Sequence, residues 1–174
     1  MTDREAHTLP LTGGCQCGAV RYALHQWPTE PSICHCRMCQ KAFGSFFAPL
    51  TGVTTDKFEI TRGELAIFMS SDEAERGFCR NCGTPLTFHY VSSNRISVSM
   101  GSLDEPERIK PEIQLGNESR LSYFGELAAL PGDQTTDEEE PERIAAIRRT
   151  NHQHPDHETS GWHPDGSEPD AEGR

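Results

Sequence analysis

Seven cysteines are the residues of this chain whose type and spacing point most specifically to chemistry. Thiolate sulfur is a preferred ligand of Zn²⁺, and cysteines separated by one or two residues are typical of zinc sites. An odd number of cysteines cannot all pair as disulfides within one chain, so the sequence predicts metal binding rather than a disulfide framework. The cysteines form a first pair (Cys15 and Cys17), a triplet (Cys34, Cys36 and Cys39) and a last pair (Cys79 and Cys82).

Seven thiols divide naturally into a set of four and a set of three. A structural zinc site is closed by four protein ligands, whereas a catalytic site keeps one position for water or substrate. One partition joins Cys36 and Cys39 to the last pair as a two-CxxC ribbon, and another joins the first pair to the last pair. We favour the second, because both pairs are followed by glycine and precede expected strands, while three ligands on one loop can reach one ion. The triplet then becomes the candidate catalytic site.

Several simpler interpretations stand beside this one. A histidine could close the triplet into a structural site, although His35 is better interpreted as a loop residue because both of its neighbours would already face the metal. The two CxxC motifs could be redox dithiols, but no βαβ pattern accompanies them. Basic side chains near the cysteines could balance the thiolate charge or simply lie at the surface; these are Arg37, Lys41 and Arg76.

The elements that must position the cysteines are mainly β-strands. Apolar and other residues alternate over residues 20–24, which predicts a half-buried strand directly after the first pair. The triplet is expected on a loop between strands, with residues 40–45 as a glycine-containing loop. No long amphipathic helix is indicated between residues 12 and 125. Further strands are expected at residues 46–50, at 58–60 and 65–69 as a hairpin, at 86–90 and 96–100 as a second hairpin, and at the sheet edge near 113–115.

The length of 174 residues suits one hydrophobic core. Residues 1–130 hold 12 basic and 15 acidic side chains, whereas residues 131–174 hold 4 basic and 12 acidic ones, so most of the net charge of −11 belongs to the end of the chain. We therefore expect a folded domain at residues 12–130 and an acidic, largely irregular tail at 131–174. The tail contains His152, His154, His157 and His163, and one short helix is expected at 142–150.

The composition also bears on partners. No basic patch with interleaved aromatics is present, and a net negative surface repels nucleic acid, so nucleic acid is excluded as a partner. The sequence shows no apolar signal core and no run of about 18 apolar residues that could span a bilayer. We expect a cytoplasmic protein with no membrane partner.

Four segments closely resemble the glutathione-dependent formaldehyde-activating enzyme (Gfa) family, also called the CENP-V/GFA domain. They are GCQCGAVRY at 14–22, CHCRMCQK at 34–41, FCRNCGTPL at 78–86 and GSLD at 101–104. The resemblance implies a β-tent (Mss4-like) fold, a structural zinc at the first and last pairs and a second, labile zinc at the triplet. It also implies a carbon-sulfur lyase activity, the reversible addition of glutathione to formaldehyde to give S-hydroxymethylglutathione.

The triplet suits thiol chemistry better than carbonyl activation. Three thiolates leave one Zn²⁺ with a net charge of −1, which weakens its Lewis acidity, whereas coordination of a further thiol deprotonates it. The alternative is a non-catalytic zinc protein that binds or carries glutathione or another small thiol. The chain departs from the common family pattern after Pro111, where Glu112 stands in place of a frequent histidine, and at Tyr123, in place of a tryptophan. These departures concern the substrate and not the cysteines.

Overall fold

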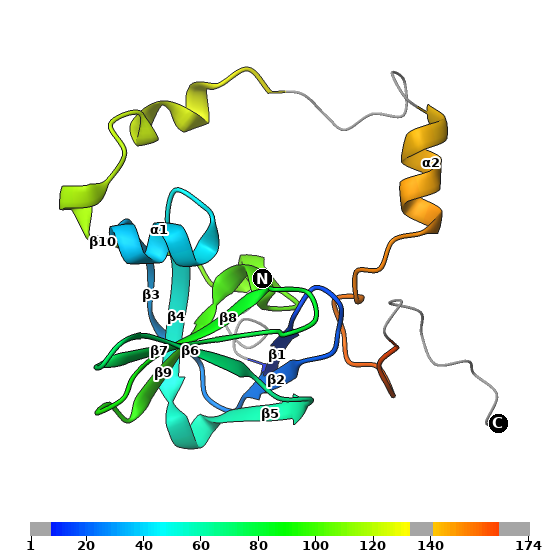
Figure 1. Ribbon diagram of the computed structural model, residues 1–174, viewed down its shortest axis with the longest axis horizontal. Coiled ribbons are helices and arrows are strands. Elements are labelled where there is room, and N and C mark those ends of the chain that lie inside the picture. Colours follow the sequence, from blue (N-terminus) through cyan, green and yellow to red (C-terminus); the bar gives the residue numbers. More distant parts are fainter. Residues whose placement is uncertain (1–7, 133–140, 164–174) are drawn as a thin grey trace.

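Two β-sheets form the framework of the computed structural model, which describes residues 8–132 and 141–163 (Figure 1). The smaller sheet has the strand order β1-β2-β5 and is antiparallel. The larger sheet has the order β10-β3-β4-β9-β8-β7-β6, and only the edge pair β10 and β3 is parallel. The strands are β1 Leu11–Gly14, β2 Arg21–Leu24, β3 Thr29–Cys34, β4 Ala48–Thr54, β5 Phe58–Arg62, β6 Ala66–Ser71, β7 Ala74–Phe78, β8 Pro85–Tyr90, β9 Arg95–Ser99 and β10 Ile113–Leu115. The fold is thus mainly β, as the sequence predicted.

Helices are short and few in the described ranges. Helix α1 spans Arg37–Phe43 and lies against β3 and β4 at one end of the larger sheet (Figure 1). Helix α2 spans Pro141–Arg149, where a short helix was expected. Five 3-10 turns, at 55–57, 100–102, 106–108, 117–119 and 124–129, connect the remaining elements. No helix of the described residues is long and apolar enough to cross a membrane.

The prediction of a half-buried strand after the first pair was wrong in one respect, because all four residues of β2 are buried. Tyr22 and Leu24 belong to the main hydrophobic core. Arg21, which alternates with them, is only 2% exposed, and its charge is compensated by ion pairs to Asp104 and Glu158. An alternating pattern indicates one wet face only when nothing covers that face, and here a loop and a later segment cover it.

The expected hairpin at residues 58–69 was also wrong. Its two strands exist as β5 and β6, but β5 pairs with β2 in the smaller sheet and β6 pairs with β7 in the larger one. Gly63, with φ +68°, lies where the chain passes between the sheets, and a Cβ there would lie 2.1 Å from the carbonyl oxygen of Ala19. The connection is therefore a crossing between sheets that only glycine accommodates.

Four elements were not anticipated. Strands β1 and β3 lie where no strand was expected, and Cys34 of the triplet is the last residue of β3 and not part of a loop. The polar sequence before the last pair contains β7, and the expected loop after the triplet is mostly helix α1, which ends at Gly44 with φ +58°. The Sγ of Cys36 caps this helix by accepting a hydrogen bond from the backbone N–H of Cys39. The hairpin of β8 and β9 and the edge strand β10 are confirmed.

Candidate metal centres

The structure brings together the first pair and the last pair, although they are more than 60 residues apart in sequence. The four Sγ atoms all lie within 4.8 Å of one another. Two of the separations are 3.6 Å, between Cys15 and Cys17, and 3.9 Å, between Cys17 and Cys79. Tetrahedral Zn²⁺ with Zn–S bonds of about 2.3 Å requires sulfur atoms roughly 3.8 Å apart. This four-cysteine group therefore has the donor set and the spacing of a closed zinc site.

Matching turns position the two halves of the four-cysteine group. Gly18 and Gly83 follow the pairs with φ +77° and +78°, and their backbone N–H groups donate to the carbonyl oxygens of Cys15 and Cys79 at 3.0 and 2.9 Å. The left-handed glycine lets the chain fold back, so that both sulfurs of each pair point to one side. Glycine after each pair was the sequence signal for this arrangement.

Thr84 connects the two halves. Its hydroxyl oxygen accepts a hydrogen bond from the backbone N–H of Gln16 at 3.1 Å and lies 3.1 Å from the Sγ of Cys82. Burial opposes ionisation of Cys82, but hydrogen bonds from Thr84 outweigh it and lower the pKa of Cys82 to about 6. Burial raises the pKa values of Cys15 and Cys17. Cys82 is therefore ready as thiolate beside Cys15 and Cys17, which need a cation to lose their protons.

The triplet forms a second group where β3 passes into α1. Cys34 is the last residue of β3, Cys36 caps α1 and Cys39 lies in the first turns of that helix. Their three Sγ atoms lie within 4.8 Å of one another. All seven cysteines are free, and no cysteine of one group belongs to the other. Three sulfurs at this spacing also fit a zinc ion, with one tetrahedral position not supplied by them.

The triplet has no fourth ligand in the part of the chain that the structure describes. No Cys, His, Asp or Glu side chain there joins the three sulfurs as a metal-ligating group. His35 is fully buried, and its Nε2 lies 3.0 Å from Oε1 of Gln114 while its ring packs edge-on against Phe47 and Phe124. The histidines of the tail up to His163 are also absent from the group. Completion by a histidine, the simpler interpretation, therefore finds no support in the geometry.

Arg76 is the basic residue that contacts the triplet. It extends from β7, is 8% exposed, and its Nη2 donates to the Sγ of Cys39 at 3.5 Å. The interpretation of Arg76 as a surface charge was wrong, because strand β7 turns it inward over Phe88. Arg37 and Lys41 are exposed, and Arg37 hydrogen-bonds Gln40 instead of a cysteine.

The three thiols of the triplet differ in how readily they ionise. Burial raises the pKa of Cys34 to about 12. Burial acts in the same direction at Cys36, but the backbone N–H of Cys39 and the charge of Arg76 lower its pKa below the usual value. Burial raises the pKa of Cys39, against the opposing effect of Arg76. Cys36 is thus the sulfur that most readily ionises without a metal.

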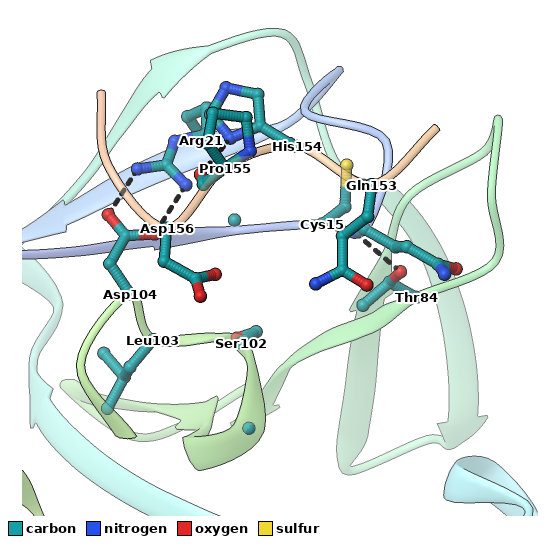
Figure 2. Close-up of a pocket in the computed structure, with 13 residues that line it drawn as sticks. Cys15, Arg21, Thr84, Ser102, Leu103, Asp104, Gln153, His154, Pro155 and Asp156 are labelled. Carbon is teal, nitrogen blue, oxygen red and sulfur yellow. Dashed lines mark hydrogen bonds and ion pairs between the residues drawn. The ribbon is translucent and has the colours of Figure 1, made fainter. Parts of the chain in front are cut away.

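A small pocket of about 170 Å³ lies beside the four-cysteine group and away from the triplet. Cys15, Thr84, Arg21, Asp104 and His154 are among the residues that line it, and Figure 2 shows the guanidinium of Arg21 facing the carboxylate of Asp104. Arg21 and Asp104 are already paired with each other at this pocket.

Comparison with known proteins relates the chain to one family. The family model described as glutathione-dependent formaldehyde-activating enzyme matches residues 10–119, which include all seven cysteines. An uncharacterized lyase of Schizosaccharomyces pombe is 35% identical over 81 residues, which cover 46% of this chain and 58% of that protein. A crystal structure of a Rhodobacter sphaeroides protein is similar with a TM-score of 0.49 and 23% identity, covering 60% of this chain and 99% of the other. The family match spans most of the chain, and the protein belongs to the glutathione-dependent formaldehyde-activating enzyme family.

Proposed function

We propose that this protein is a zinc-dependent carbon-sulfur lyase that resembles S-(hydroxymethyl)glutathione synthase and acts on a glutathione-aldehyde adduct. The observation that carries the proposal is the triplet: three sulfurs within 4.8 Å of one another with no fourth protein ligand in the described ranges. A closed site has no room for a substrate, whereas three protein ligands leave one position for it. Cys34, Cys36 and Cys39 are therefore the candidate catalytic metal ligands, and the four-cysteine group is the candidate structural zinc site.

The proposed reaction needs neither an oxidant nor a reductant. The sulfur of glutathione forms a bond to the aldehyde carbon, the C=O π bond becomes a C–O single bond, and the thiol proton ends on that oxygen. The reverse reaction breaks the same carbon-sulfur bond. A zinc ion bound by the triplet would supply a Lewis-acidic position that lowers the pKa of a thiol or polarises a carbonyl oxygen.

The chain's own residues hold the site in shape. The carbonyl oxygen of His35 accepts a hydrogen bond from Nε2 of Gln40 at 2.7 Å, which fixes the backbone between Cys34 and Cys36. Gly116, with φ +65°, follows β10, and a Cβ there would lie 2.6 Å from the backbone nitrogen of Cys36. Rigid support of this kind keeps three sulfurs aimed at one point, as a preorganised site requires.

We further infer a β-tent (Mss4-like) fold, on the strength of the family membership and of a four-cysteine group whose two halves follow strands of different sheets. A cytoplasmic location is part of the same proposal, since seven free thiols require a reducing compartment. Glutathione and a small aldehyde are the proposed partners.

Kinetics at sub-stoichiometric protein distinguish a lyase from a carrier. Because glutathione adds to formaldehyde spontaneously, the rate of exchange between free and adduct forms is measured by NMR with and without the protein. A lyase accelerates exchange far beyond one event per protein molecule, and Cys36→Ser abolishes the acceleration. Lys41→Gln, a change at an exposed neighbouring helix residue, should leave it intact. Depletion of free glutathione only one for one, with no acceleration, would favour the carrier.

A further inference from the structure

Among the described residues, Arg76 is a buried cation without a carboxylate partner. Its side chain makes no ion pair to an Asp or Glu in the described part of the chain, and the neighbouring Glu75 contacts His89 instead. One guanidinium nitrogen, Nη2, donates to Cys39, while the other, Nη1, is buried and has no hydrogen-bond partner among the described residues. The guanidinium carbon lies 4.9 Å from the centre of the Phe88 ring.

A buried cation is costly unless an anion compensates it. The stacking on Phe88 contributes a modest attraction that does not replace an ionic partner. Cys39 of the triplet is the group hydrogen-bonded to Arg76 that can become anionic. Arginine keeps its charge at every physiological pH, so the compensation has to come from thiolates.

We propose that Arg76 is a positioning residue of the triplet, whose charge and N–H group favour the metal-loaded form of this site. The inference rests on the proposed binding of zinc by the triplet. Relative to three protonated thiols, three thiolates around a divalent ion lower the charge of the site from zero to −1. One positive charge at Cys39 makes the loaded site neutral overall.

The sign of the effect follows from this charge change. Arg76 stabilises the loaded form relative to the empty one, so its removal weakens metal affinity at the triplet. A hydrogen bond to a charged group contributes enough to change an equilibrium roughly ten- to a hundredfold. The hydrogen bond of Arg76 goes to the triplet, so the four-cysteine group should keep its affinity.

The test compares Arg76→Gln, which removes the charge, with Arg76→Lys, which keeps it. Arg95→Gln is the matched control, because Arg95 lies on the same sheet but at the other end of β4 from the triplet. Arg95 is the register partner of Thr54 at one end of β4, whereas Cys34 is the partner of Ala48 at the other end. The affinity of the 174-residue chain for Co²⁺ is measured at pH 7 by chelator competition, with the thiolate-to-Co²⁺ absorption as the signal. Thermal unfolding of each variant is followed in parallel.

We expect Arg76→Gln to weaken the weaker of two Co²⁺ sites about ten- to a hundredfold, Arg76→Lys to recover most of this loss, and Arg95→Gln to match the wild type. Equal affinity in Arg76→Gln and wild type, or an Arg76→Lys variant as weak as Arg76→Gln with an unchanged unfolding temperature, would overturn the inference. If Arg76→Gln does not fold, the comparison of Arg76→Lys with the wild type still tests the inference. A lysine keeps the positive charge, so a tenfold loss of metal affinity in Arg76→Lys would contradict the inference. The assay uses no glutathione, so a wild type that binds Co²⁺ at the triplet but lacks lyase activity would refute the proposed function and leave the role of Arg76 standing.

Discussion

The indole Nε1 of Trp162 donates a hydrogen bond of 2.6 Å to the backbone carbonyl of Cys17, across 145 positions of sequence. The backbone N–H of His154 donates in the same way to the carbonyl of Gln16 at 2.7 Å. Residues 151–163, which lie beyond the range matched by the family model, thus cover the turn of the first pair. This segment lies beside the smaller sheet in Figure 1.

Trp162→Phe tests whether that contact stabilises the domain. The substitution removes the N–H donor from a partly buried carbonyl and shortens the apolar contact, so the free energy of unfolding should fall by about 1–2 kcal/mol. Denaturant unfolding of the zinc-loaded protein measures the change. His163→Gln, next along the chain, is the control and should leave stability unchanged. Identical midpoints for Trp162→Phe and wild type would show that the segment does not stabilise the core.

The ion pair of Arg21 and Asp104 predicts a specific acid dependence. Burial alone would raise the pKa of Asp104, but the guanidinium of Arg21 and the hydroxyl of Thr12 lower it below the usual value of 3.8. A carboxyl group whose pKa is lower in the folded than in the unfolded state stabilises the fold at pH values above its unfolded pKa. This stabilisation is lost as the pH falls through the folded pKa. Unfolding curves recorded between pH 7 and pH 2 should therefore show a free energy of unfolding that begins to fall near pH 4.

Asp104→Asn should remove that part of the acid dependence and cost about 3–5 kcal/mol at pH 7, because it breaks a buried ion pair. Glu158→Gln is the matched comparison, since Glu158 also pairs with Arg21 but is 44% exposed, and it should cost less. A larger loss for Glu158→Gln than for Asp104→Asn would contradict this ordering.

The two cysteine groups should respond differently to loss of a ligand. Cys79→Ser breaks the site that joins the two turns, and structural zinc contributes folding free energy directly, so the variant should lose its cooperative unfolding transition. Cys36→Ser should keep the transition and lose one bound metal. Circular dichroism with metal analysis measures both. Equal loss of structure in the two variants would argue against the division into structural and open sites.

The thiols of the triplet should also differ in reactivity once the labile metal is removed. Cys36 has a lowered pKa and Cys34 one of about 12, so Cys36 forms more thiolate at neutral pH. Alkylation at pH 7 followed by peptide mass analysis should label Cys36 before Cys34. Preferential labelling of Cys34 would contradict the electrostatics described for the site.

The sequence predicted the grouping of cysteines better than the path of the chain. Glycine after each pair indicated the matching turns that the structure brings together at the four-cysteine group. The burial of Arg76 could not be predicted, because its sequence neighbours are polar and its contact lies 37 residues away at Cys39. The same holds for β5 and β6, since local alternation identifies a strand but not the sheet that accepts it.

The tail illustrates a further limit of sequence patterns. His154 belongs to the tail that was expected to be acidic and largely irregular, and the structure packs it against Gly18. Composition reports how acidic a segment is, whereas its contacts depend on single residues such as Trp162 and Glu158 that meet partners on the core. Residues 133–140 and 164–174, which belong to the tail predicted to be acidic and largely irregular, lie outside the described residues.

Zinc content per chain, measured before and after incubation with excess glutathione, tests the central claim most directly. The account predicts two zinc ions per chain, of which one, at the triplet, becomes exchangeable with isotopically labelled zinc when glutathione is added. The other should stay in place at the four-cysteine group. A single zinc per chain in protein purified with zinc present, or two ions whose exchange glutathione does not affect, would contradict an open, thiol-accepting site at Cys34, Cys36 and Cys39.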